Sequence, residues 1–299
     1  TNRIFSFLNW MEENEEWNID KTKTFSAGSS MGGSGSLMMA IRYPELVAWS
    51  RSWVGVHIPE KSPAYFSAYT GYYGKPSYGV LFENGTPVWD YYNDVWYLRN
   101  YPNAEIGFLT FANGKNDSGI GWEQAVEFYE ALQETKRPHL FVWGQSGHRE
   151  RAIMPKTWSE NVMPIDIRTD LSLPAFTACS LDDIPGDGDP ANGDLKGQIN
   201  AYLYWETEDI VDTEEKWEMT MVLMEKAPEN SCTVDITPRR LQNLKSVAGE
   251  EFLWKNIDVA SGEVIASGTL VADQYGLLTV EQTAVSKTKN RIVIEKIIQ

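Results

Sequence analysis

The sequence has few of the residues that build metal centres and disulfide frameworks. Among its 299 residues are two cysteines, Cys179 and Cys232, and three histidines. Neither set has the spacing of a zinc motif, and two cysteines do not make a disulfide framework. The two thiols could form a disulfide, or both could be buried and reduced. We therefore expect neither a cofactor nor a metal centre from these residues.

Basic residues and long apolar runs are also scarce. Lys and Arg total 26 against 42 Asp and Glu, which gives a formal net charge of −16. That balance argues against nucleic acid or an anionic membrane surface as a partner. No apolar run approaches the roughly 20 residues that span a bilayer, so we expect no membrane span. The length and the 42% hydrophobic content indicate a globular protein of two domains.

The most informative stretch is the run GSSMGG at residues 28–33, which carries a G-x-S-x-G motif. It lies between a β-like run, residues 22–27, and a helix-like run, residues 35–43. A tight strand-to-helix turn of this kind holds a serine hydroxyl away from its own backbone and makes it available to a base. The spacing predicts Ser30 as a nucleophile, although a Gly/Ser loop without chemistry would read the same.

The residues around Ser30 fit the same interpretation. Gly28 and Gly32 flank the serine, and we expect the turn to leave no room for side chains at either position. The free N–H groups at the start of the following helix would face the reaction centre. We expect the backbone N–H of Met31 to be one half of an oxyanion hole.

Two further residues follow predicted strands. Asp117 comes shortly after the strand at residues 105–112, and His148 follows the strand at residues 139–143. Carboxyl ends of parallel strands meet at the ligand-binding edge of an open α/β sheet. In a serine-histidine-acid relay the histidine takes the serine proton and the acid orients the imidazole. We therefore predict the catalytic residues to be Ser30, Asp117 and His148.

Other interpretations of these polar residues stay open. Asp117 could be only a turn former, in which case Glu123 or Asp94 would be the acid. His57 is expected on the surface or in a loop, and His139 is expected to be structural. Residues 59–102 are rich in aromatics, Gly and Pro. They read as a loop that either binds substrate or packs on itself.

The chain resembles a known family at three segments. AGSSMGGSGSLMMAIRYPEL, FANGKNDSGIGW and VWGQSGH are similar to the second half of a serine α/β-hydrolase of the esterase or prolyl-oligopeptidase-like type. The resemblance covers residues 22–150. It implies a mostly parallel sheet flanked by helices, and a second oxyanion N–H from a loop before Ser30.

The resemblance also implies several strands before the Ser30 turn, and this sequence starts too close to that turn to hold them. It starts at Thr1 rather than Met. We therefore expect an N-terminally truncated catalytic domain over residues 1–160, with the second oxyanion donor upstream of Thr1. The lack of a signal peptide is then no evidence about location.

From residue 165 to 299 the pattern changes to short alternating strands separated by turn signals, which predicts an all-β sandwich of Ig-like or fibronectin-like size. The segments DDIPGDGDPANGD and TVDITPRRLQNLK resemble C-terminal modules of bacterial secreted hydrolases, many of them linked to polysaccharide breakdown. That resemblance implies an extracytoplasmic location, secreted or periplasmic.

Two clusters in the second domain have a structural and a functional interpretation. Asp187, Asp189 and Asp194, with Asn192, could bind calcium, but their spacing is not that of an EF-hand, and an Asx-rich turn is the expectation. Arg239 and Arg240 could bind a carboxylate, although we expect an exposed pair.

Together these patterns predict a serine carboxylic-ester hydrolase acting through an acyl-enzyme on Ser30. Its substrate would be a small-molecule or glycan ester, with acetyl or feruloyl groups on a polysaccharide as the candidates. One alternative is a prolyl-oligopeptidase-like peptidase, which would use the same catalytic residues. The other is a glycan-binding protein that has the hydrolase fold but no catalytic activity. The sequence does not identify substrate-binding residues or the oligomeric state.

Overall fold

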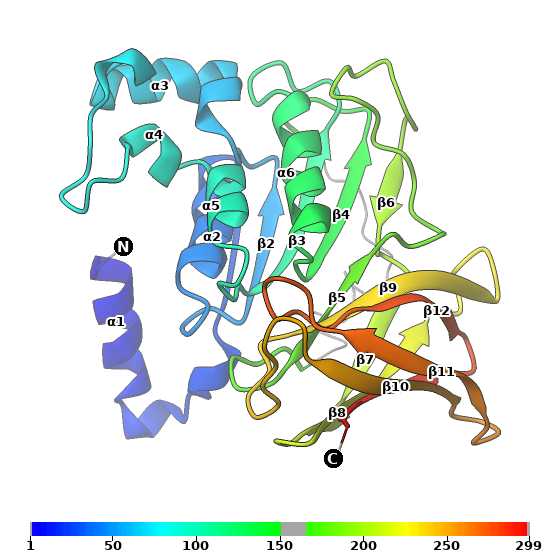
Figure 1. Cartoon of the computed structure of the whole chain (residues 1–299). Helices are drawn as coiled ribbons and strands as arrows, with labels where there is room; N and C mark the ends of the chain where they lie inside the picture. Colours follow the sequence, from blue (N-terminus) through cyan, green and yellow to red (C-terminus); the bar gives the residue numbers. More distant parts are fainter. Residues whose placement is uncertain (1, 151–165, 298–299) are drawn as a thin grey trace.

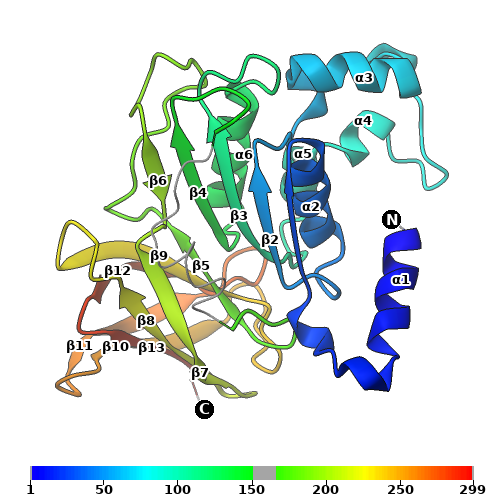
Figure 2. The same cartoon turned by 180° about the vertical axis from the view of Figure 1, so that it is seen from behind.

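A computed structural model describes residues 2–150 and 166–297 of the chain. Residues up to 150 form a sheet with helices on one face, and the all-β part lies beneath it (Figure 1). Seen from behind, the all-β part again lies below the first sheet (Figure 2), and the two parts share one apolar core. Within the described residues, no helix combines the length and apolarity needed to cross a bilayer.

The first sheet has the strand order β1-β2-β3-β4-β6, and its first four strands run parallel. The short strand β6 pairs antiparallel with β4 and closes that edge. The strands are β1 (Phe25–Ser29), β2 (Trp49–Trp53), β3 (Phe108–Gly114), β4 (His139–Gly144) and β6 (Gly197–Ile199). The predicted parallel sheet is confirmed, and all four of its parallel strands end at one edge.

The central strands β3 and β4 are buried on both faces, which explains their apolar sequences, whereas β1 at the sheet edge alternates between exposed and half-buried residues. Phe111 and Phe141 point to the helical face, whereas Phe108 and Leu140 point to a core shared with the all-β part. Alternate residues of a strand point to opposite faces, so each strand contributes to two cores. The helices on the first face are α2 (Met31–Arg42), α5 (Asp94–Asn100) and α6 (Glu123–Glu134).

The aromatic stretch at residues 59–102 is more regular than expected. It contains α3 (Pro63–Tyr73) and α4 (Val88–Tyr91) before α5, and 3₁₀ turns at Pro59–Lys61 and Pro76–Tyr78. Proline at the first turn starts α3, because its fixed φ suits a helix and its missing N–H has no partner there. At the N-terminal end of the chain, α1 (Asn2–Glu12) is followed by 3₁₀ turns at Glu15–Trp17 and Lys21–Lys23.

The second part holds two antiparallel sheets, of orders β11-β10-β13-β8-β7 and β12-β9-β5. The expected all-β character of this part is confirmed. The strands are β5 (Leu173–Thr177), β7 (Leu203–Asp212), β8 (Lys216–Leu223), β9 (Ser231–Arg239), β10 (Glu251–Asp258), β11 (Val264–Val271), β12 (Val280–Ser286) and β13 (Asn290–Lys296).

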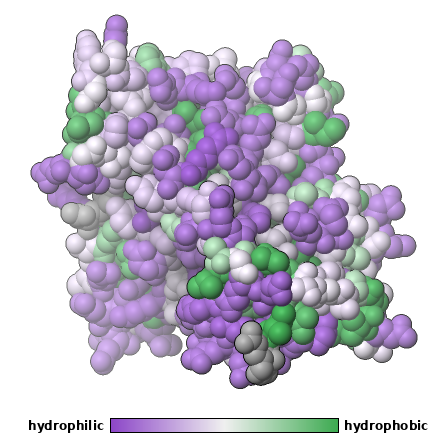
Figure 3. All heavy atoms as spheres, in the orientation of Figure 1, coloured by the Kyte–Doolittle hydropathy of each residue, from purple (hydrophilic) through white to green (hydrophobic). Residues whose placement is uncertain are grey.

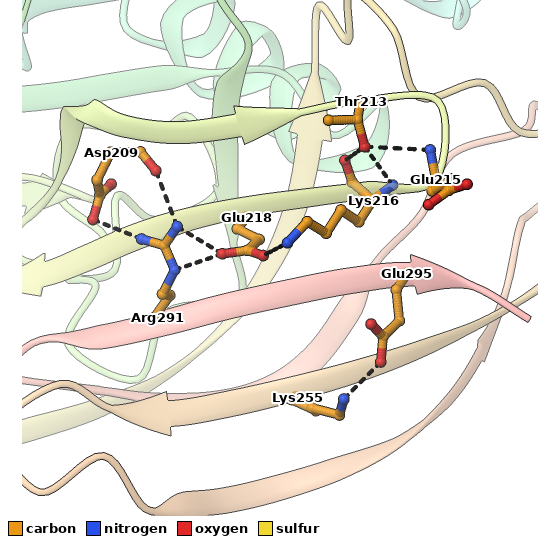
Figure 4. Close-up of polar contacts among 8 residues, drawn as sticks. All are labelled: Asp209, Thr213, Glu215, Lys216, Glu218, Lys255, Arg291 and Glu295. Atoms are coloured by element: carbon orange, nitrogen blue, oxygen red, sulfur yellow. Dashed lines mark hydrogen bonds and ion pairs between the residues drawn. The ribbon is translucent and has the colours of Figure 1, made fainter.

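The outer face of the five-stranded sheet carries ion pairs between neighbouring strands (Figure 4). Arg291 lies 2.6 Å from Glu218 and 2.7 Å from Asp209, and Lys255 lies 2.6 Å from Glu295. These side chains are partly exposed, so each pair contributes little to stability. The pairs do mark this face as solvated, which leaves the inner face to form the core.

The expected boundary at residues 160–165 needs amendment, because the chain returns to the first sheet after that point. Strand β6 joins β4, and a continuous core includes Leu140 of the first sheet and Trp217 of the second part. Arg239 is 1% exposed and Arg240 is also buried, so the expectation of an exposed pair is wrong.

The Arg239 guanidinium bonds the first part of the chain to the second. Its nitrogens donate to the carbonyls of Thr135 and Ala104 at 3.2 Å, and Nε lies 3.2 Å from the Glu105 carboxylate. Arg240 Nη2 donates to the carbonyl of Ile106 at 3.0 Å. Thr135 and Ile106 are buried, so the two arginines satisfy carbonyl acceptors in the protein interior.

His57 is buried, which corrects the expectation of a surface histidine. Its ring stacks on Phe128 with a centroid distance of 4.0 Å, and its backbone N–H donates to Gln124 Oε1 at 2.7 Å. Burial lowers the pKa of His57 from its ordinary 6.5 to about 3. His139 is buried as well, as expected of a structural histidine.

Replacing Arg239 with Met should lower the free energy of unfolding by about 3 kcal/mol or more, because the carbonyls of Thr135 and Lys136 lose the guanidinium that donates to them. Lys255→Met is the matched control, since it removes a cation from the exposed pair in Figure 4 and should cost less than about 1 kcal/mol. Urea unfolding of both variants measures the difference, and equal losses would contradict the role assigned to Arg239.

His57→Phe should flatten the acid limb of the stability profile. Because the folded pKa of His57 is lowered, its contribution is complete above about pH 6.5 and is lost as the pH falls toward about 3. The loss can reach about 1.4 kcal/mol per pH unit. Urea unfolding between pH 7 and pH 4 tests this, and an equally steep loss in wild type and variant would refute it.

Candidate active site

Ser30 occupies the turn between β1 and α2 in a backbone conformation that is rare for a side chain larger than hydrogen. Its φ is 57° and its ψ is −124°. Such backbone strain costs about 1–3 kcal/mol and is found where a site requires it. The N–H of Ser30 donates to the carbonyl of Trp53 at 2.8 Å, which fixes the turn to the end of β2.

The glycines around Ser30 differ in how much space they have. A Cβ added at Gly28 would lie 2.2 Å from the carbonyl oxygen of Gly32, so Gly28 is required as expected. A Cβ at Gly32 would meet nothing within 4 Å, so the expectation of crowding there is wrong. The second crowded position is Gly33, where a Cβ would lie 2.6 Å from Ser52 Oγ. The helix packs against β2 at Gly33 and leaves Gly32 open.

Two short hydrogen bonds connect Ser30, His148 and Asp117. His148 Nε2 lies 2.8 Å from Ser30 Oγ, and His148 Nδ1 lies 2.7 Å from Asp117 Oδ2. The other Asp117 oxygen accepts the N–H groups of Gly119 and Ile120, both at 3.1 Å. The structure therefore brings together all three residues predicted from sequence and holds the acid in one orientation.

The fallback acids lie in other environments. Glu123 is exposed and lies 2.6 Å from Lys61, whereas Asp94 is buried 3.6 Å from Arg42. Burial raises the pKa of Asp94 to about 7, although the neighbouring Arg42 opposes that rise. Asp117 is the acid that faces His148.

The loops that carry Asp117 and His148 are bonded to each other. Lys115 N–H donates to the carbonyl of Gly144 at 2.9 Å, and Asn116 Nδ2 donates to the carbonyl of Gln145 at 2.7 Å. A Cβ at Gly114 would lie 2.2 Å from the carbonyl oxygen of Ser146, so the two loops meet backbone to backbone. Their separation is thereby fixed, and with it the distance from acid to base.

Lys115 is a supporting residue that the sequence analysis missed. Its side chain is 1% exposed, and Nζ donates to the carbonyls of Asn192 and Asp194 at 2.5 and 3.0 Å. Burial lowers the pKa of Lys115. The loop around residues 182–195 thus supports the Asp117 turn from outside, and only the fold could reveal this.

The acidic side chains of that loop bond within the loop. Asp187 accepts the N–H of Asp189 at 3.1 Å, Asp189 accepts the N–H of Ala191 at 2.9 Å, and Asp194 accepts the N–H of Ile184 at 2.8 Å. These are the Asx turns expected for this composition. Over the described ranges, no three His, Cys, Asp or Glu side chains are placed to hold a metal ion. Cys179 and Cys232 are buried free thiols.

A cavity of about 410 Å³ opens beside Ser30 and His148. Ala64 and Tyr65 of α3 form one wall, and Ile120 belongs to another. Tyr65 Oη lies 3.4 Å from Ser34 Oγ on the first turn of α2. The start of the aromatic insertion therefore reaches the site.

The rest of the insertion packs on itself through its rings. Tyr69 and Tyr92 have centroids 5.0 Å apart, Phe66 and Trp89 lie 5.4 Å apart, and the hydroxyls of Tyr73 and Tyr92 are 3.0 Å apart. The interpretation of residues 59–102 as a segment that packs on itself is therefore confirmed for most of its rings, and substrate binding by its first turn stays a prediction.

Met31 is the first residue of α2, so its N–H has no acceptor within the helix. That N–H lies next to Ser30 at the positive end of the helix dipole, where an oxyanion would be stabilised. The serine, the imidazole, the buried carboxylate and this N–H are the groups that acyl transfer requires.

The sequence model of the Putative esterase family matches residues 7–162, more than half of the chain. The chain belongs to this family, and the expectation of a serine hydrolase is confirmed at that level. No curated protein matches the sequence.

Solved structures with similar folds include two named enzymes. An S-formylglutathione hydrolase from Agrobacterium tumefaciens is 18% identical, with a TM-score of 0.38 over 48% of each chain. An acylaminoacyl peptidase from Pyrococcus horikoshii is 15% identical, with a TM-score of 0.38 over 49% of this chain and 22% of its own. The chain thus spans less than half the length of either structure.

Gly28→Ala should destabilise the protein by about 2 kcal/mol or more, because the new methyl group would overlap the Gly32 carbonyl. Gly32→Ala adds the same methyl group to a helical position with open space, and should be neutral or stabilising by up to about 1 kcal/mol. Thermal unfolding distinguishes the two. Equal destabilisation would show that the close approach at Gly28 does not hold the turn.

Proposed function

We propose that the protein is a serine carboxylic-ester hydrolase that forms an acyl-enzyme on Ser30. The observation that carries the proposal is the continuous hydrogen-bonded path from Ser30 Oγ through His148 to the buried Asp117 carboxylate. The strained turn at Ser30 supports it, because strain of this kind exposes the hydroxyl at the end of a strand.

In the first half-reaction, His148 Nε2 takes the proton of Ser30 as Oγ attacks the ester carbonyl carbon. The carbonyl oxygen becomes an oxyanion beside the Met31 N–H. Collapse of this tetrahedral intermediate breaks the bond to the alcohol oxygen, which receives the proton from His148. In the second half-reaction, His148 takes a proton from water as the water oxygen attacks the acyl carbon. The bond between that carbon and Ser30 Oγ then breaks, Oγ receives the proton from His148, and the carboxylic acid leaves.

Asp117 supports both halves by holding the imidazole in one tautomer. Its Oδ2 accepts from Nδ1, so that Nε2 faces Ser30 with a free lone pair. The N–H groups of Gly119 and Ile120 occupy Oδ1 and keep the carboxylate from rotating. The imidazolium that forms during the reaction would then lie next to a fixed negative charge.

The substrate we propose is an acylated polysaccharide, with acetyl or feruloyl as the acyl group, in an extracytoplasmic setting. The open cavity with Tyr65 on its wall supports a substrate that combines an acyl group with a bulky alcohol. The all-β part would then be an Ig-like or fibronectin-like module of a secreted hydrolase. These finer assignments rest on the sequence resemblance described above.

Ser30→Ala should abolish covalent labelling by a fluorophosphonate probe in the natural gene product. Asp117→Asn should lower turnover of 4-nitrophenyl acetate by about three orders of magnitude, because the imidazole loses its fixed tautomer. Glu123→Gln, an acid next to the same loop that faces Lys61, is the matched control and should retain both activities.

The outcome of the labelling experiment decides between the alternatives. A folded protein that takes up no label would favour a glycan-binding scaffold without catalysis. Labelling together with faster cleavage of peptide amides than of esters would identify a peptidase and overturn the ester assignment.

A further inference from the structure

A second cavity lies in the all-β part, where the two sheets differ in width. Five strands face three, so the inner face of β10 and β11 extends beyond the opposite sheet. The pair Phe252 and Leu270 is still covered and buried. The next pair, Trp254 and Gly268, lies further along the same face. Trp254 lines an open cavity of about 410 Å³.

The walls of this cavity are polar and come from two parts of the chain. Lys136, from the turn between α6 and β4, reaches across to donate to Thr279 Oγ1 at 2.8 Å and to Asp273 Oδ2 at 3.2 Å. Glu281 of β12 lies exposed on the wall. One indole, one ammonium group, two carboxylates and a hydroxyl therefore surround one space.

The backbone at the walls is strained in two places. Lys136 has a φ of 51°, and Gln282, next to Glu281, has a φ of 45°. The pairing of β12 with β9 shifts register between Val280 and Thr283, which marks a bulge at Glu281 and Gln282. The bulge re-aims the side chain of Glu281, whereas the left-handed Lys136 ends α6, with the N–H of Arg137 bonded to the carbonyl of Leu132 at 2.9 Å.

We propose that this cavity, which we call the Trp254 cleft, binds a neutral sugar unit of an oligosaccharide. A sugar ring presents an apolar C–H face and a rim of hydroxyls. The indole can pack against the C–H face, and Lys136, Asp273, Thr279 and Glu281 offer donors and acceptors to the hydroxyls. The two carboxylates and the net charge of −16 disfavour an anionic glycan.

The Trp254 cleft is remote from Ser30. Lys136 precedes β4 and so lies near the amino end of the parallel strands, whereas Ser30 follows the carboxyl end of β1 (Figure 1). The cleft would therefore hold part of a polymer away from the reacting ester. This binding does not depend on the chemistry proposed for Ser30, and it can be measured when that chemistry is removed.

Gly268→Val tests the cleft without deleting any of its groups. A Cβ at Gly268 would lie 3.0 Å from Trp254 Nε1, so a valine must displace or cover the indole. Ser267→Val is the matched control, because it adds the same side chain to the adjacent residue of β11, which points to the other face. Both changes suit a strand and leave the buried core intact.

The measurement is affinity gel electrophoresis in a Ser30→Ala background, with soluble xylan, galactomannan, mixed-linkage β-glucan or polygalacturonate in the gel. We expect at least one neutral polymer to retard the protein, Gly268→Val to weaken that binding at least tenfold, and Ser267→Val to leave it unchanged. Glu281→Gln should weaken it several-fold. Circular dichroism and thermal unfolding confirm that each variant is folded.

Three outcomes would overturn the inference. Retardation by none of the neutral polymers would exclude the ligand class, and retardation by polygalacturonate alone would identify an anionic ligand instead. Equal binding by folded Gly268→Val and wild type would place binding elsewhere. Turnover of 4-nitrophenyl acetate by Gly268→Val with an intact Ser30 is measured in parallel. This turnover should be unchanged, so a loss of sugar binding at the Trp254 cleft is distinguished from a loss of ester hydrolysis at Ser30.

Discussion

The geometry of the candidate active site depends on two hydrogen bonds of the His148 imidazole, one to Ser30 and one to Asp117. Its two bonds of 2.8 and 2.7 Å require three separate turns to keep their spacing. Parallel strands supply that spacing, because β1, β3 and β4 end at the same edge and adjacent strands are held at a fixed separation. Strand geometry does not fix the positions of the loops that follow the strands. Hydrogen bonds between the Asp117 and His148 loops fix those positions.

The all-β part contributes to that precision from outside the site. It shares an apolar core with the face of the sheet opposite the helices, and its loop around residues 182–195 receives the buried ammonium group of Lys115. Arg239 and Arg240 satisfy carbonyls at the amino end of the same sheet. A buried cation that bonds to carbonyls is costly to displace, so these contacts fix how the two parts meet.

The site and the strands were predictable where the signal is local. Ser30, Asp117 and His148 follow from a turn motif and from positions after strands, and the all-β character of the second part follows from alternation. The rest depends on partners distant in sequence. Nothing near Arg239, Lys115 or His57 shows that each is buried, since their acceptors and stacking partners come from other elements. The crowding at Gly33 rather than Gly32 depends on how α2 meets β2.

Backbone strain links the two cavities, and in both it is held by specific bonds. Ser30 is fixed by its N–H bond to Trp53. At the Trp254 cleft, Arg239 donates to the carbonyl of the strained Lys136 at 3.2 Å, and the N–H of Gln282 donates to Asp235 at 2.7 Å. Each strained residue costs about 1–3 kcal/mol, which is comparable to the hydrogen bonds that hold it. Because Arg239 also joins the two parts of the chain, the geometry of the Trp254 cleft depends on the same hydrogen bonds that hold the two parts together.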